Sequence, residues 1–123
     1  MTAISMLATL VSPDKAWADR ALAISLGECG AIFDILAQAA SERAEEQAER
    51  MGIAAGLFFD EAYGEAENSG GLDPIGWMTD EEERLRDKWG NRLLDPALTD
   101  ENRVWVTDCL VLGREQGVLP IID

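Results

Sequence analysis

Carboxylate side chains at helical spacing are the residues of this chain best placed to do chemistry. Glu42 begins a set of four glutamates at intervals of 0, 3, 4 and 7, which places them on one face of a helix. Such carboxylates can pair with Lys and Arg on a basic protein surface, or they can ligate a cation such as Mg²⁺. The candidate acidic residues are Glu42, Glu45, Glu46, Glu49, Asp60, Glu61, Glu65 and Glu67.

The negative charge is concentrated in residues 51–83. This segment has nine acids and no Lys or Arg, so it carries −9 of the formal net charge of −14. A field of one sign usually acts on a partner of the opposite sign. We expect no direct binding to nucleic acid or to an anionic membrane, because the acids would repel the phosphates. The partners that remain are a basic protein surface, a metal cation or a second copy of the chain.

The composition argues for binding and against catalysis. The chain has no His, which excludes a Ser-His or Cys-His pair within it. We expect no catalytic residue, no metal and no cofactor, and therefore not an enzyme. A chain of 123 residues with 47% apolar residues predicts a single acidic domain over 1–123 with one core.

The two cysteines lie far apart in the sequence. Cys109 is part of an apolar run, which predicts a small buried hydrophobe. A disulfide with Cys29 would require an oxidising compartment. The apolar stretch at 4–11 has no basic residue before it and is too short for a secretory signal or a membrane span. We therefore expect free thiols and a cytoplasmic protein.

The apolar spacing predicts helices and no clear strand. A short helical stripe covers 3–11, a helix begins at Ser12-Pro13, and Gly27 and Gly30 either interrupt it or allow close packing. A longer helix is expected over about 31–51, followed by a helical piece over 53–63 with Ile53, Leu57 and Phe58 facing inward. Gly52 would end or kink the longer helix.

The second half of the chain predicts two further helices. Thr79 to Glu82 form a capping box, which predicts a helix from 79 to 89 with Gly90 as its stop. The last helix is expected to run from 99 to about 116. Its expected core residues are Val104, Trp105, Cys109, Val111 and Leu112. The fold prediction is an all-α, compact bundle of five or six helices.

A loop rich in Gly and Pro is expected around 68–78. Gly70-Gly71 and Asp73-Pro74 break helical structure there. Trp77 either pins this loop to the core or is an exposed anchor, since Trp is enriched at interface hot spots. The apolar tail at 118–122 is expected to pack back on the helices. The acids at 80–83 are expected to stabilise the N-terminus of a helix through its dipole. The earlier acids have no such structural role, so together with Trp77 they are the better candidates for a binding site.

These features predict an inhibitor or adaptor that docks through an acidic face on a basic, nucleic-acid-binding surface of a partner protein, including a nucleic-acid-binding complex. A short, acidic chain without a catalytic set resembles, as a class, phage-borne inhibitors of host defence nucleases such as anti-CRISPR and anti-restriction proteins. That resemblance implies a DNA mimic, whose carboxylates stand at a spacing compatible with phosphates.

Two alternatives use the same residues. A self-associating structural or adaptor protein would form a homodimer through an Ala-rich face at 40–48 and the apolar tail. The chain is also similar in part to the Mg²⁺-dependent all-α nucleotide pyrophosphatases, which use Glu-x-x-Glu followed by Glu-x-x-Asp. Here Glu42-x-x-Glu45 and Glu46-x-x-Glu49 match the first half of that motif, and the second half is missing.

Overall fold

The structure is a computed structural model that describes residues 13–40 and 44–119. Helices make up almost all of these ranges, which confirms the all-α prediction. The described elements are α2 (Pro13–Ala40), α3 (Glu45–Ser69), α4 (Pro74–Leu93), the short 3₁₀ helix η1 (Pro96–Leu98) and α5 (Thr99–Glu115). The helix predicted over 3–11 lies outside the described residues.

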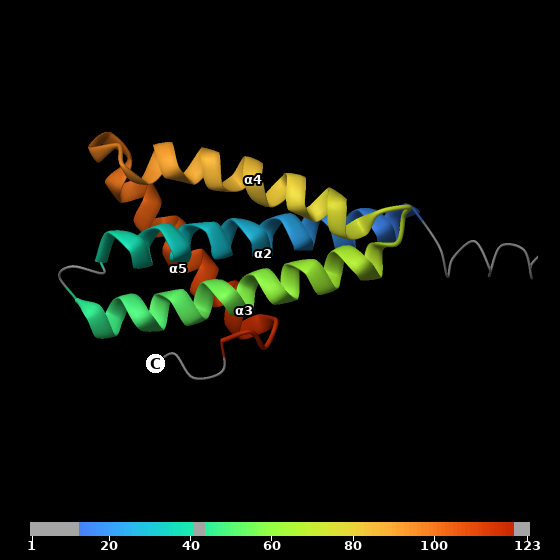
Figure 1. Cartoon of the computed structure of the whole chain (residues 1–123), viewed down its shortest axis with the longest axis horizontal. Coiled ribbons are helices and arrows are strands. Elements are labelled where there is room, and N and C mark those ends of the chain that lie inside the picture. Colours follow the sequence, from blue (N-terminus) through green and yellow to red (C-terminus); the bar gives the residue numbers. More distant parts are fainter. Residues whose placement is uncertain (1–12, 41–43, 120–123) are drawn as a thin grey trace, which may run out of the picture.

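Helix α2 is the centre of the fold. It lies between α3 and α4, which run alongside it, and α5 crosses behind α2 and α3 (Figure 1). Leu26, Ala31 and Ile32 of α2 point in different directions around the helix, yet all three are completely buried. Apolar residues that point in several directions are buried only when neighbouring helices lie on several sides. The other three α-helices provide that cover.

Two glycines let the neighbours come close to α2. A Cβ atom at Gly27 would lie 2.9 Å from the Met78 methyl group, and one at Gly30 would lie 3.0 Å from the Phe59 ring. Real side chains rarely tolerate such distances. Helix α2 therefore continues through both glycines, and close packing is the correct one of the two sequence-based interpretations.

The predicted helix over 31–51 is wrong at its end. Helix α2 is described up to Ala40, Ala44 lies outside any helix, and α3 runs unbroken from Glu45 through Gly52 to Ser69. Three predicted pieces therefore form two long helices, and the described ranges contain four α-helices where five or six were expected. Ala-rich sequence favours helix on both sides of the break, and Ala44 provides no side-chain cap to mark the new start.

Helix α4 begins before the predicted capping box. Pro74 is its first residue, and the Asp73 side chain accepts a hydrogen bond of 3.1 Å from the Gly76 N–H. Thr79 lies inside the helix, where its hydroxyl donates to the Ile75 carbonyl at 2.8 Å. Two start signals compete here, and Asp followed by Pro prevails over the Thr-x-x-Glu pattern. The loop is consequently 70–73, shorter than the predicted 68–78.

Helix α4 also continues past Gly90, its predicted stop, and ends at Leu93. Nothing lies within 4 Å of a Cβ atom added at Gly90. A glycine acts as a helix stop when it adopts a positive φ, and within the described ranges only Gly70, Gly71 and Gly117 have positive φ. A glycine in a helical pattern can therefore either end the helix or lie inside it.

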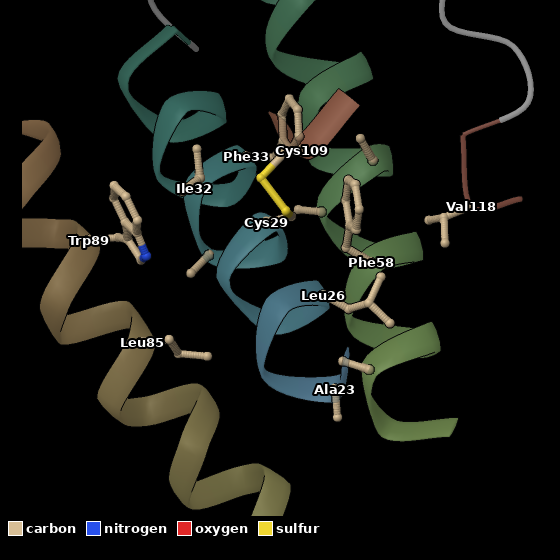
Figure 2. Close-up of a cluster of buried hydrophobic side chains, with 14 of the residues drawn as sticks. Ala23, Leu26, Cys29, Ile32, Phe33, Phe58, Leu85, Trp89, Cys109 and Val118 are labelled. Atoms are coloured by element: carbon tan, nitrogen blue, oxygen red, sulfur yellow. A yellow bond between two sulfur atoms is a disulfide. The ribbon is translucent and has the colours of Figure 1, made fainter. Parts of the chain in front are cut away.

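One hydrophobic core joins the described helices (Figure 2). Phe33 of α2 stacks on Phe58 of α3 with ring centroids 5.6 Å apart. Trp89 of α4 is fully buried and meets Trp105 of α5 edge to face at 5.1 Å. The remaining large side chains with almost no exposure are Leu26, Ile32, Met78, Leu85 and Cys109.

The inward side of α5 differs from the prediction. Val104 and Val111 are exposed, while Cys109 is buried, and Trp105 and Leu112 pack against the core. Apolar residues occur on both sides of this helix, so their periodicity does not fix its orientation. Gly113 helps to fix it, because a Cβ atom there would lie 2.6 Å from Leu119.

The C-terminal end of α5 was predicted correctly. Gly117 adopts a φ of 70°, and the Val118 N–H donates to the Gly113 carbonyl at 2.8 Å. Val118 and Leu119 are buried, so the described part of the apolar tail packs back on the helices as expected. The rest of that tail, with Ile121 and Ile122, lies outside the described residues.

The expectation of free thiols is wrong. Cys29 of α2 and Cys109 of α5 form a disulfide with their Cα atoms 5.5 Å apart (Figure 2). Both residues are buried in the core. Nothing local in the sequence reveals this proximity, since it arises only when α5 folds back across α2.

One helix of the described ranges, Ala18–Ala40 within α2, is long and apolar enough to cross a membrane by length and composition alone. Half of the tested window is buried inside the fold. The core helix of a soluble protein passes the same test, and the burial of α2 under its neighbours explains its apolar character.

Removing the disulfide is expected to destabilise the protein strongly. The bridge closes a loop with a sequence separation of 80 residues, for which the loss of chain entropy predicts roughly 4 kcal/mol. Urea unfolding of the Cys29→Ala, Cys109→Ala double variant should show this loss. Reductant should shift the midpoint of the wild type and leave that of the double variant unchanged. An identical midpoint for the wild type with and without reductant would contradict the disulfide.

The close packing at Gly30 predicts opposite effects for the same substitution at two glycines. Gly30→Leu should destabilise the protein by about 1–3 kcal/mol, because the added side chain overlaps the Phe59 ring. Gly90→Leu, which meets no atom at its Cβ position, should stabilise α4 by roughly 0.5–1 kcal/mol. Thermal unfolding of both variants measures the contrast. Equal effects would mean that α2 and α3 are not in close contact at Gly30.

Candidate functional site

The side of α3 that is turned away from the core carries several of the candidate acids from the sequence analysis. Its buried side consists of Ala54, Ala55, Phe58, Ala62 and Ala66. The opposite side is exposed along the whole helix. We call this side the outer face of α3, and it comprises Glu46, Glu49, Arg50, Gly52, Ile53, Gly56, Leu57, Asp60, Gly64 and Glu67.

The predicted acids do not all lie on this face. Glu45 is exposed at its edge, in the first turn of α3, whereas Glu61 and Glu65 are half-buried on one flank of the helix. Successive helical residues point about 100° apart, so Glu61 cannot share the direction of Asp60. Glu42 lies outside the described residues.

The acids of the outer face keep their charge uncompensated. Among the described residues, no salt bridge involves Glu46, Glu49, Asp60 or Glu67. From residue 51 to its end, α3 contains no Lys or Arg. Beyond the exposed Arg50, this face therefore presents only negative charge to the solvent, where it acts on basic groups that approach from outside.

Two bases of α4 are engaged on another side of the molecule. Arg86 of α4 forms salt bridges with Asp34 of α2 and with Glu82 on its own helix. The Lys88 ammonium group lies 3.3 Å from the Glu28 carboxylate. These bases compensate acids along the contact of α2 with α4, on the side of the molecule away from the outer face of α3.

Two large apolar side chains lie in the middle of the outer face. Ile53 is 59% exposed and Leu57 is 42% exposed, although the sequence pattern predicts that both face inward. That prediction is wrong because Ala54, Phe58 and Ala62 form a complete i, i+4 row that faces the core instead. This Ala row was the signal available in the sequence.

The outer face also contains glycines that the fold does not need. Nothing lies within 4 Å of a Cβ atom built at Gly52, Gly56 or Gly64. Each glycine costs a helix about 1 kcal/mol relative to Ala, and no contact in the described structure recovers this loss. Gly27 and Gly30 of α2, by contrast, are required by their neighbours.

The acids of the outer face are unevenly spaced. With a rise of 1.5 Å per residue, Glu49 and Asp60 lie about 16 Å apart along α3, and Ile53 and Leu57 occupy the interval. Phosphates along one DNA strand advance about 3.4 Å per nucleotide along the axis. The face is thus an apolar centre between acidic ends, which differs from an even ladder of carboxylates.

Trp77 lies at one end of the bundle, in the first turn of α4. It is half-buried, and the Arg20 guanidinium group stacks 5.5 Å from the centroid of its ring. A small cavity of about 150 Å³ lies beside both residues, lined also by Gly71 and Asp73. Helix α3 is about 36 Å long, so Trp77 is near its C-terminal end and remote from the glutamates at 45–49. The structure does not bring the two groups together.

A polar network that the sequence does not reveal ties three helices together. The Tyr63 O–H donates to Glu82 at 2.9 Å, and the Thr79 hydroxyl lies 3.2 Å from the same Tyr63 oxygen. Burial raises the pKa of Tyr63, and Glu82 adds to that rise. Partial burial alone would lower the pKa of Arg86, but its hydrogen bonds to Asp34 and Glu82 raise it. Every member has a partner, so the network is structural.

The described ranges contain no group of three Asp, Glu or Cys side chains that converge as metal ligands would. The first half of the Glu-x-x-Glu motif includes Glu42, outside these ranges. The magnesium alternative stays a prediction from the sequence, and its second pair, Glu46 and Glu49, lies on α3. No protein-family model matches the chain, and no curated protein or solved structure matches it either.

Proposed function

We propose that this protein binds another protein through the outer face of α3, and that the partner offers a basic, nucleic-acid-binding surface. The observation that carries the proposal is the exposed pair Ile53 and Leu57 between acids that have no salt bridge among the described residues. Protein interfaces commonly have such an apolar centre and a polar rim.

The two parts of this face would contribute in different ways. The acids at its ends attract a basic surface over a distance of about a Debye length, which raises the association rate and selects the partner. The apolar centre contributes affinity when it is removed from water. Binding that combines both parts weakens with salt but is not abolished by it.

A nucleic-acid-binding surface is the basic surface that fits best. Such surfaces collect Lys and Arg to neutralise phosphates, and a protein seated there excludes the nucleic acid by its bulk and by its charge. The protein would then act as an inhibitor, or as an adaptor when the bound surface is not essential. The uneven acids support competition for a basic surface more than imitation of a phosphate chain.

Charge reversal on the outer face tests this proposal. The triple variant Glu49→Lys, Asp60→Lys, Glu67→Lys should no longer capture a basic protein from extracts of the source organism, because attraction becomes repulsion. The variant Asp80→Lys, Glu83→Lys, Asp87→Lys changes the net charge equally on exposed positions of α4 and should capture it as the wild type does. Equal capture by all three proteins would show that α3 is not the contact.

The disulfide bears on the compartment in which this binding takes place. The cytoplasm stays a prediction from the sequence, but disulfides persist mainly in oxidising compartments, and the buried Cys29–Cys109 pair favours one. In acid-quenched extracts of the source organism that are then denatured, we expect both cysteines to resist alkylation until a reductant is added. Immediate alkylation of both, measured by mass spectrometry, would place the protein in a reducing compartment.

A further inference from the structure

We infer that the partner contacts the outer face of α3 with a basic helix, whose side chains enter a groove along Gly52 and Gly56. The inference rests on the proposed function and specifies the shape and chemistry of the partner. It depends on how the exposed apolar, small and acidic residues are arranged in two neighbouring rows on α3.

The first row is a ridge. Glu49, Ile53, Leu57 and Glu61 follow one another at i, i+4 spacing, and the two apolar members project into solvent. The second row contains Gly52, Gly56, Asp60 and Gly64 at the same spacing. Three glycines with open space around them make this row a groove beside the ridge. Helices pack by inserting the ridges of one into the grooves of the other.

The surface suits a helix better than an extended segment. An added strand binds through unpaired backbone groups at a sheet edge, and the interior of α3 has none, because its backbone groups bond within the helix. A helix instead binds through side chains at i, i+3 and i+4, which match the rows on α3. The glycines would allow the two backbones to approach closely.

The charges select a basic helix over a second copy of this chain. Glu49 and Asp60 lie on either side of Gly56 along the face, and Glu61 closes the end of the apolar ridge. A second copy would bring the same acids against them, within a protein of net charge −14, and like charges at an interface oppose association. Lys and Arg on the flanks of a partner helix would be attracted.

Two synthetic peptides test the inference. The first is an 18-residue amphipathic helix with an Ala and Leu stripe flanked by Lys and Arg. The second has the same sequence with two central residues replaced by their D-enantiomers, which keeps the charge but disrupts the right-handed helix. Fluorescence anisotropy should show that the wild type binds the first peptide about tenfold more tightly or better. Equal binding of both peptides, or no binding of the first, would overturn the helical contact.

Substitution of the groove provides the matched comparison. Gly56→Leu and Gly52→Leu should each weaken binding of the helical peptide about tenfold and leave the weak binding of the disrupted peptide unchanged. Gly90→Leu on α4 should leave both unchanged. Each leucine variant should melt at or above the wild-type temperature, because Leu favours helix more than Gly. Unaltered binding of the helical peptide by both groove variants would also overturn the inference.

Two outcomes separate this inference from the proposed function. If both peptides bind equally and the triple charge reversal on α3 abolishes their binding, the acidic face is the contact and only the helical geometry is wrong. If charge reversal has no effect on either peptide, the proposed function fails together with the inference. A light-scattering mass of two chains that Gly56→Leu reduces to one would assign the groove to a second copy, and this also overturns the inference.

Discussion

The burial of the middle of α2 is the constraint on which the rest of the structure depends. Seven of the eight residues from Leu26 to Phe33 are buried, so α3, α4 and α5 must each cover part of this stretch. Gly27 and Gly30 allow two of these neighbours to come close, and the Cys29–Cys109 disulfide attaches the third. Helix α3 consequently turns its Ala row and Phe58 toward α2, and this orientation decides which of its residues remain exposed.

The distribution of charge follows from the same arrangement. Arg86 and Lys88 lie where α4 meets α2, and they compensate Asp34, Glu82 and Glu28. From residue 51 to Ser69, α3 has no base of its own, and the outer face of this stretch is turned away from the core. No described base of α4 compensates the acids of that outer face, so the concentration of charge along the sequence becomes a concentration in space.

Local patterns in the sequence predict a helix boundary well where the sequence offers only one start or stop signal. The final helix, its Gly117 stop and the return of Val118 follow from short-range rules. The predicted start of α4 was wrong because the sequence offers two helix-start signals there, Asp73-Pro74 and Thr79. The disulfide and the Tyr63 network could not be predicted, since both join residues that only the tertiary fold brings together.

Only part of the candidate site was predicted from the sequence. Its acids were recognised, but Ile53 and Leu57 were assigned to the core, because their helical period is the same whether a face looks inward or outward. Gly52 and Gly56 indicate that this face of α3 points outward, because no neighbouring atom requires a glycine at either position. Poor helix formers on an exposed face lower stability without any contact in return, and such departures from local preference concentrate at functional sites. Gly52 and Gly56 lower the stability of α3 and make no contact that requires a glycine, and this is a reason to expect a partner on this face.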